Sequence, residues 1–342
     1  MRKIQFIIGL IIFFVCTGQL FAQTENAVGQ RTFSFEDKHR NRKLITEVWY
    51  PTLAQPSADE TSPFISMATA RNGAISKGTF PVILFSHGTG GGRLTIEWFC
   101  ATLASHGYIV VAVDHFGNTF DNPIPIEFVK FWERPQDITF VLNQLLDTPE
   151  ISSSMNVKKI GVAGFSLGGF TAIALAGGKM DYDALQNYFK TDAGKKEADV
   201  PEMPGLLSFM GNPEVRESFK QAPPLKDARI KCAFVMSPAI GHAFPGKMNF
   251  KDVVVPVCIV AAGKDRIAPL QTNAAHYAAM IERSQYHVVG TEAGHYVFLN
   301  EAKEGLKSQA PVFFQDPAGV DRRSIHQQTL TLALEHFNKV LK

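Results

Sequence analysis

The pattern Gly164-Phe165-Ser166-Leu167-Gly168 constrains this chain more than any other feature of its sequence. It follows the short apolar run 160–163 and opens a segment rich in alanine and glycine that ends near Ala176. G-x-S-x-G between a strand and a helix forms a sharp turn, in which both glycines avoid collisions with neighbouring backbone. The turn lifts the serine hydroxyl above the sheet, near a helix N-terminus that favours negative charge. We predict that Ser166 is a nucleophile; a glycine-rich turn of structural use only is the alternative.

Strand-like and helix-like segments alternate along most of the chain, which predicts a mostly parallel sheet flanked by helices. Near-continuous apolar runs are expected where both faces of a strand are covered. The predicted strands are 44–50, 82–86, 108–114, 160–163, 231–236, 253–262 and 286–289, and the predicted helices are 96–105, 137–146, 272–281 and 324–340.

The segment 178–227 interrupts this alternation with prolines and glycines, charged residues and a short apolar group. We interpret it as a cap or lid inserted on the sheet of a single domain that spans residues 23–342. Its apolar side chains either line a substrate pocket or form a small satellite core under a long surface excursion. The candidate pocket residues are Leu206, Leu207, Phe209 and Met210.

Residues 1–22 are typical of a secretory signal peptide. Arg2 and Lys3 precede an apolar run over 4–16, and the small residue Ala22 ends the segment. The run is shorter than the roughly 20 residues that a spanning helix needs, which disfavours the alternative of an N-terminal membrane anchor. Val15 is bulky where a small residue would precede a lipidated Cys16. We expect a secreted or periplasmic protein with no stable membrane insertion after cleavage.

The net charge and the cysteine content limit the classes of partner and cofactor that we expect. The formal net charge is +2, and loss of Arg2 and Lys3 would bring it to zero. A neutral surface gives no electrostatic reason to expect nucleic acid or an anionic membrane. The remaining cysteines, Cys100, Cys232 and Cys258, are odd in number, so at least one thiol is free. No cysteine or histidine spacing resembles a metal site, and we expect no metal or other cofactor.

A nucleophilic serine needs a base, and the base needs an acid that fixes its tautomer. After a G-x-S-x-G turn the chain order is serine, acid, histidine. Asp265 follows the predicted strand 253–262, and His295 follows the last predicted strand in a glycine-containing loop. His287 falls inside a strand and His242 comes before the acid, so both fit the base less well. Asp252 precedes its strand and Glu292 lies only three residues before His295.

A tetrahedral intermediate requires preorganised hydrogen-bond donors for its oxyanion. One donor is expected from the backbone N–H of Leu167, directly after the nucleophile. The other is expected from the loop His87-Gly88-Thr89-Gly90-Gly91, at Thr89 or, as a second choice, Gly88. In this interpretation His87 has a structural role and holds the loop in place. A phosphate-binding loop is the competing interpretation, but no Gly-Lys-Ser/Thr ending follows.

The stretches LFSHGTGGG, LASHGYIVVAVDH, GVAGFSLGG, VAAGKDRIAP and AGHYVFL resemble the dienelactone hydrolases and the secreted platelet-activating-factor acetylhydrolases. The resemblance includes Trp49-Tyr50-Pro51 and Arg134-Pro135 with Asp137. It implies the α/β-hydrolase fold, a mostly parallel central sheet flanked by helices, with triad roles for Ser166, Asp265 and His295.

Two departures from the pattern of these families matter. Dienelactone hydrolases use a cysteine nucleophile, where this chain has Ser166. The phospholipase-like members place their acid after an earlier strand, but Met236-Ser237-Pro238 carries no carboxylate there. The sequence GKDRIAP instead resembles the acid loop of cutinase-like polyester hydrolases and related carboxylesterases, which supports Asp265.

Together these features predict an exported serine hydrolase that cleaves carboxylic esters of small molecules or polymers through an acyl-enzyme. Two alternatives remain: a serine peptidase or amidase on the same fold, and a non-catalytic binding module. Peptidases of this fold commonly carry a large extra domain, for which a chain of this length leaves little room. Fold analogy does not separate esters from amides.

Overall fold

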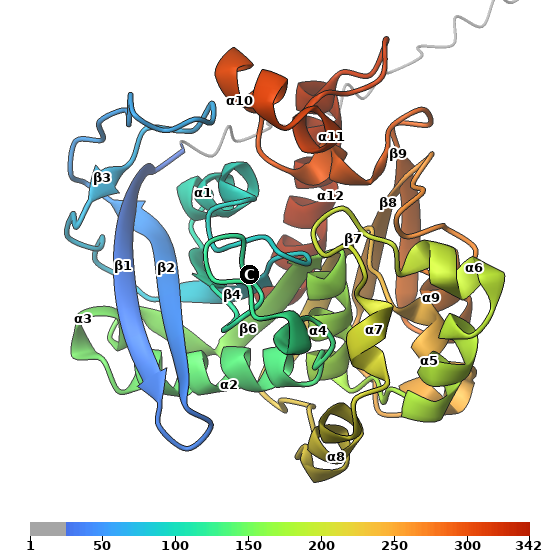
Figure 1. Cartoon of the computed structure of the whole chain (residues 1–342). Coiled ribbons are helices and arrows are strands. Elements are labelled where there is room, and N and C mark those ends of the chain that lie inside the picture. Colours follow the sequence, from blue (N-terminus) through green and yellow to red (C-terminus); the bar gives the residue numbers. More distant parts are fainter. Residues whose placement is uncertain (1–24) are drawn as a thin grey trace, which may run out of the picture.

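The computed structural model describes residues 25–342 and has a nine-stranded sheet at its centre (Figure 1). The strand order is β3-β1-β2-β5-β4-β6-β7-β8-β9. The strands from β5 to β9 run parallel to one another, and β2 pairs antiparallel with both β1 and β5. The strands are β1 Ala27–Asp37, β2 Arg42–Thr52, β3 Ala70–Arg71, β4 Phe80–Ser86, β5 Ile109–Val113, β6 Met155–Phe165, β7 Ile230–Met236, β8 Val257–Ala262 and β9 Ser284–Val289.

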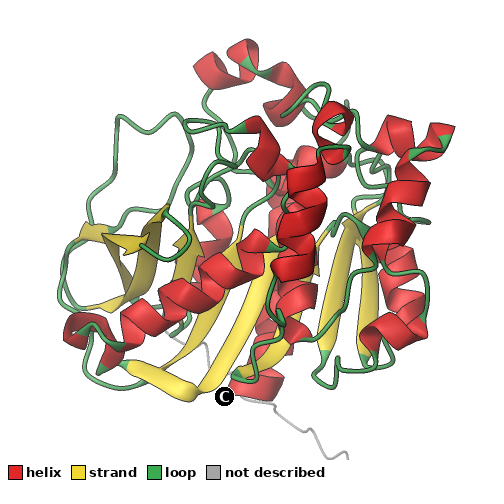
Figure 2. Ribbon diagram, turned by 60° about the horizontal axis from the view of Figure 1, so that its bottom comes forward, coloured by secondary structure: helices red, strands yellow, loops and turns green. Residues whose placement is uncertain are grey.

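Helices cover both faces of this sheet (Figure 2). The helices α1 (Glu97–Ser105) and α12 (Arg322–Leu341) contribute to one buried apolar cluster, and α2 (Glu133–Leu146), α4 (Leu167–Ala176) and α9 (Ala274–Met280) contribute to the other. Because both faces are covered, every residue of β5 is buried, as its unbroken apolar sequence predicts. The predicted parallel sheet flanked by helices is confirmed.

Shorter elements connect these parts. They are η1 Pro125–Phe128, α3 Pro149–Ser152, α5 Tyr182–Phe189, α6 Asp192–Glu197, α7 Leu207–Met210, α8 Pro213–Gln221, η2 Gly241–Ala243, η3 Lys247–Phe250, η4 His295–Phe298, α10 Glu304–Gln309 and α11 Pro311–Phe314. Within residues 25–342, no helix is both long and apolar enough to cross a membrane. The predicted signal peptide, 1–22, lies outside the described residues.

The structure departs from the predicted boundaries in a few places. The strand β1 has no counterpart among the predictions, because intermediate and exposed positions alternate along its central part. Helix α2 begins four residues before the predicted start, since Pro135 sits in its first turn, where proline needs no amide donor. Strand β8 begins at Val257, directly after Pro256, whereas the prediction began at 253.

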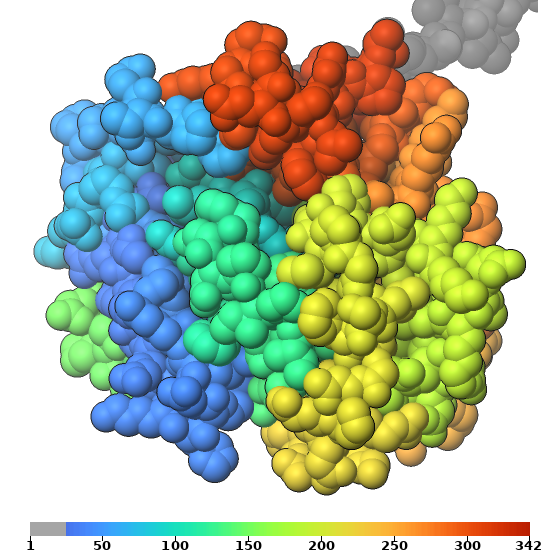
Figure 3. All heavy atoms as spheres, viewed as in Figure 1, coloured from blue at the N-terminus to red at the C-terminus, as the bar shows by residue number. Residues whose placement is uncertain are grey.

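The inserted segment 178–227 folds into four short helices, α5 to α8. In the space-filling view its yellow-green surface meets the green surface of the region around η1 along a seam (Figure 3). Contacts between α7 and η1 join the two sides. The indole Nε1 of Trp132 also donates to Ser218 Oγ at 3.0 Å, which ties the insertion to the start of α2.

Candidate active site

Ser166 lies on the turn between β6 and α4, with φ 55° and ψ −121°. This left-handed conformation is strained for a residue with a side chain. A Cβ on Gly164 would lie 2.0 Å from the Gly168 carbonyl oxygen, and a Cβ on Gly168 would lie 1.9 Å from the Ser86 carbonyl oxygen. Only glycine fits at these two positions, for the reason that the G-x-S-x-G pattern predicts.

The side chains of Asp265 and His295 meet in the loops after β8 and β9. His295 Nδ1 lies 2.6 Å from Asp265 Oδ2, and both side chains are almost fully buried. A carboxylate only accepts, so Nδ1 carries the proton and Nε2 is left to face another group. The imidazole packs against the Phe165 ring at 4.8 Å between centroids, which places it beside the residue that precedes Ser166.

The Asp265 carboxylate is itself fixed by its loop. Its Oδ1 accepts hydrogen bonds from the backbone N–H groups of Ile267 at 3.0 Å and Ala268 at 2.8 Å. Asp265 can therefore hold the His295 ring in one orientation. The structure brings these two residues together at the carboxyl ends of the parallel strands, where the turn of Ser166 also lies.

The competing candidates lie elsewhere. Glu292 is exposed and forms an ion pair with Lys264, and Asp252 forms one with Lys179. His287 lies within β9 at the sheet edge. None of these three shares a hydrogen bond with Ser166, Asp265 or His295 in residues 25–342.

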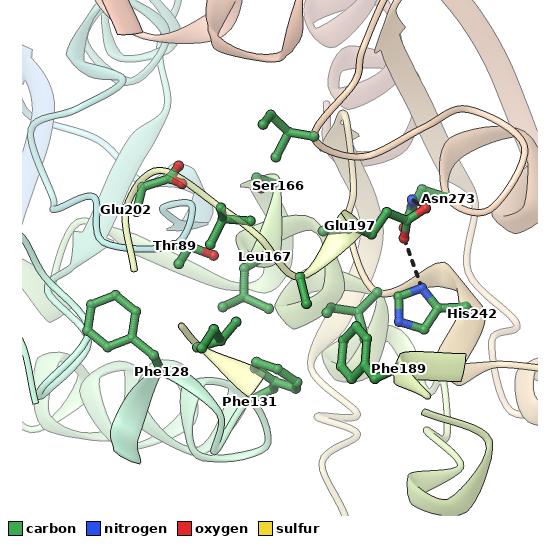
Figure 4. A pocket seen from close by; sticks show the side chains of 16 residues that line it. Thr89, Phe128, Phe131, Ser166, Leu167, Phe189, Glu197, Glu202, His242 and Asn273 are labelled. Carbon is green, nitrogen blue, oxygen red and sulfur yellow. Dashed lines mark hydrogen bonds and ion pairs between the residues drawn. The ribbon is translucent and has the colours of Figure 1, made fainter. Parts of the chain in front are cut away.

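Thr89 and Leu167, the predicted donors for an oxyanion, line one pocket together with Ser166 (Figure 4). Within the described part of the chain, neither backbone N–H donates to another protein group. Gly88, the second choice, approaches the serine closely, because a Cβ on it would lie 3.3 Å from Ser166 Cβ. Two residues whose amides have no acceptor within residues 25–342 thus line the same pocket as Ser166.

The loop of residues 87–91, which carries Thr89 and is called the donor loop below, is anchored by buried histidines. His87 Nδ1 donates to the Gly88 carbonyl at 2.7 Å, and its Nε2 accepts from the His115 backbone N–H at 3.2 Å. The predicted structural role of His87 agrees with these contacts. His115 in turn lies 3.0 Å from Asp137 Oδ2 and 2.9 Å from Ser86 Oγ. Burial lowers the pKa of His115 to about 3, so the ring is neutral and bridges an acceptor and a hydroxyl donor.

Two buried arginines complete this network. Arg42 binds both oxygens of Asp137, at 2.8 and 3.0 Å. Arg134 donates to the His87 carbonyl and, at 3.1 Å, to Asn118 Oδ1, which also accepts from the Gly90 N–H. Arg134 is 1% exposed, and its Nη2 also donates to Ser86 Oγ at 3.3 Å. The loop that carries Thr89 is therefore fixed from beneath by charge-assisted hydrogen bonds.

We expect Asp137→Ala to lower the free energy of unfolding by about 3 kcal/mol, because it removes one of the two carboxylates that pair with the buried Arg42 and leaves only Glu127 to balance its charge. Burial alone would raise the pKa of Asp137, but the charge of Arg42 and the hydrogen bond from His115 lower it below its ordinary value. The stabilisation that the ionised Asp137 provides is therefore complete above the ordinary carboxyl pKa of about 4. It is lost as the pH falls through the pKa of Asp137 in the folded protein.

Urea unfolding of wild type, Asp137→Ala and the exposed control Asp147→Ala over a range of pH checks this prediction. The difference between wild type and Asp137→Ala should shrink toward acid pH, and Asp147→Ala should resemble wild type. An Asp137→Ala protein as stable as wild type at neutral pH would show that the network holds nothing in place.

The pocket beside Ser166 has aromatic walls and a polar far end (Figure 4). Phe128, Phe131 and Phe189 supply rings, while Glu197, His242 and Asn273 lie together at one end. At the other end Glu202 lies near Thr89, and its Oε2 has no hydrogen-bond partner within residues 25–342. Burial raises the pKa of the Glu202 carboxyl. A Cβ at Gly90, where φ is +59°, would lie only 3.0 Å from the Cβ of Glu202, so glycine is required at this position.

Of the four pocket residues predicted from the sequence, the structure places only Leu206 in the lining. Met210 is buried in the main core, and Leu207 and Phe209 are partly buried against it. The short helix α7 thus turns these three side chains toward the core, as the alternative of a packed excursion describes. Sequence reasoning missed the polar end of the pocket, because its members come from α6, η2 and the segment before α9.

Within residues 25–342, no three histidine, cysteine or acidic side chains are grouped so as to hold a metal ion. Cys100, Cys232 and Cys258 are buried free thiols. Burial raises the pKa of Cys232 and of Cys258 to about 12, so these thiols stay protonated and unreactive at neutral pH.

A model of the alpha/beta hydrolase family matches residues 83–306, which is well over half of the chain. The protein belongs to this family. A model described as platelet-activating factor acetylhydrolase, isoform II, matches residues 26–119. These matches confirm the fold class and the group of hydrolases that the sequence resembles.

Two named proteins are similar to parts or all of the chain. A probable 1-alkyl-2-acetylglycerophosphocholine esterase of Arthroderma benhamiae is 34% identical over 113 residues, which is 28% of this chain and 27% of that protein's length. The structure of a ferulic acid esterase from Streptomyces cinnamoneus is 19% identical, with a TM-score of 0.58 over 93% of this chain and 91% of that one. The second likeness establishes a shared fold.

Proposed function

We propose that the protein is a serine hydrolase that cleaves carboxylic esters, with Ser166, His295 and Asp265 as nucleophile, base and acid. The observation that carries this proposal is the buried hydrogen bond of 2.6 Å between His295 and Asp265, beside the strained turn of Ser166. A structural turn has no need of an oriented imidazole at its side. Two esterases among the similar proteins support the ester as substrate.

The reaction then proceeds in two halves. Ser166 Oγ attacks the carbonyl carbon while its proton passes to His295 Nε2, and the oxyanion takes hydrogen bonds from the N–H groups of Thr89 and Leu167. The C–O bond to the leaving group breaks, and His295 returns the proton to the departing alcohol. Water next attacks the acyl-enzyme and gives a proton to His295, which passes it to Ser166 Oγ as the acid is released.

We also propose that the chain is exported, on the support of residues 1–22 alone. Measuring where the full-length chain accumulates, with and without these residues, tests that proposal separately from the activity. We expect the full-length chain to be exported and the shortened chain to stay inside the producing cell.

A series of nitrophenyl esters with increasing acyl length, beside nitroanilides of the same acids, tests the activity. We expect turnover of the esters with a preference for certain acyl lengths, because the pocket is closed by aromatic walls, and much slower turnover of the anilides. Equal rates on the anilides would indicate an amidase. Absence of turnover on the whole series would favour a binding module and contradict the proposal.

A further inference from the structure

The polar far end of the pocket contains His242, a buried histidine whose hydrogen bonding is incomplete. The His242 side chain is 7% exposed, yet its Nε2 has no hydrogen-bond partner within residues 25–342. A buried polar group without a partner costs about 1–3 kcal/mol. His242 lines the pocket that Ser166 and Leu167 also line, so a molecule bound there can supply the missing partner.

The position of this imidazole is fixed from all sides. Its ring stacks on Tyr188 at 4.0 Å between centroids and meets Phe189 edge-on at 5.1 Å. Its Nδ1 lies 3.3 Å from Glu197 Oε2. The carboxylate of Glu197 is held through Oε1 by Thr272 Oγ1 and by Tyr188 Oη at 3.2 Å. These contacts hold the ring in place without a ligand. A binding site whose side chains are already fixed in this way is preformed.

The pocket takes the acid part of the ester rather than the alcohol. Ser166, Thr89 and Leu167 line it, and these residues surround the reacting carbonyl in the proposed reaction. His295, which would protonate the departing alcohol, is not part of the lining. The leaving group therefore lies on the other side of the serine, and the acyl chain points toward His242.

Charge limits what the far end can bind. The lining includes two carboxyl side chains, Glu197 and Glu202, and no lysine or arginine. A carboxylate on the substrate would meet Glu197 directly behind the imidazole. With Nδ1 facing the Glu197 carboxylate, the neutral ring carries its proton on Nδ1 and leaves Nε2 as an acceptor, to which a hydroxyl group can donate.

We propose that His242, supported by Glu197, is a specificity-determining residue that binds a hydroxyl group on the acyl part of the substrate, remote from the ester carbonyl. This inference rests on the proposed function for the direction of the acyl chain. It narrows the substrate class to esters of hydroxylated acids.

Binding to a Ser166→Ala protein tests the subsite without relying on catalysis. The ligands are straight-chain acyl esters of increasing length, each ending in a methyl, a hydroxyl or a carboxylate group. At the length that reaches His242, the hydroxyl ester should bind about 3- to 10-fold more tightly than the methyl ester. Adding His242→Phe, which keeps the stacking on Tyr188, should bring this ratio to one. Adding His287→Phe, a matched change on the edge strand, should leave it unchanged.

The same ligands, as substrates of the protein with Ser166 intact, should show the same ratio in kcat/KM. Hydrolysis without a hydroxyl preference at any length would overturn the subsite and leave the esterase proposal standing. Absence of hydrolysis combined with His242-dependent binding of hydroxyl esters would overturn the esterase proposal alone. A preference for the carboxylate series, or a His242→Phe protein that melts earlier with its hydroxyl ratio unmoved, would also overturn the inference.

Discussion

Ser166→Ala is expected to reduce kcat on any ester substrate by about 10⁵–10⁶-fold, because no other group can form the acyl-enzyme. The same substitution should abolish covalent labelling by a fluorophosphonate. Only Oγ is removed, so the strained turn and its two glycines keep their packing. The measurement is the rate of nitrophenyl ester hydrolysis together with the labelled fraction.

Ser208→Ala provides the matched control, since Ser208 is exposed on α7 and removed from the turn. It should retain the wild-type rate and labelling. Circular dichroism and the melting temperature confirm that Ser166→Ala is folded. Labelling that persists in the folded Ser166→Ala protein would assign the nucleophile to another serine and refute the proposed mechanism.

Asp265→Asn is expected to lower kcat/KM by about 10⁴-fold. The asparagine side chain has nearly the same volume, but its amide can no longer hold His295 with a proton on Nδ1 or stabilise the imidazolium that forms during attack. The loop should survive, because an amide oxygen can still accept from the Ile267 and Ala268 N–H groups. Steady-state kinetics on the best ester of the chain-length series measures the loss.

Glu292→Gln is the control for this change, as Glu292 is an exposed carboxylate near His295 in sequence and pairs with Lys264 instead. It should leave kcat/KM within about twofold of wild type, as an exposed ion pair contributes little. Near-wild-type activity in Asp265→Asn would mean that a different carboxylate orients the base. A large loss in Glu292→Gln would identify that carboxylate.

Much of the fold could be predicted because buried parallel strands carry an unmistakable pattern. Residues such as those of β5 are apolar at every position, and the glycines of the turn around Ser166 are demanded by backbone contacts of about 2 Å. These constraints act within a few residues of sequence. Asp265 could be singled out in the same way, because it follows a buried strand and lies at the carboxyl ends of the parallel strands, where the turn of Ser166 also lies.

The pocket could not be predicted in this way. His242 meets Glu197 across the boundary between the insertion and the loop after β7, and Asn273 reaches the Gly241 N–H from the segment before α9. Such contacts depend on how short helices dock, which no periodic pattern records. Phe209 illustrates the same limit, because an apolar residue in an irregular segment fits a core as well as a pocket.

The network beneath the donor loop separates two kinds of constraint on this molecule. Arg42, Asp137 and Arg134 belong to β2 and α2, whereas Glu197 and Leu206 belong to the insertion between α4 and β7. The residues that anchor the donor loop and the residues that the insertion adds to the pocket thus lie on different segments of the chain. Replacing the insertion could exchange one set of acceptable acids for another while the reacting groups keep their positions. Selectivity would then be shared between this replaceable segment and His242 on η2, which lies outside it.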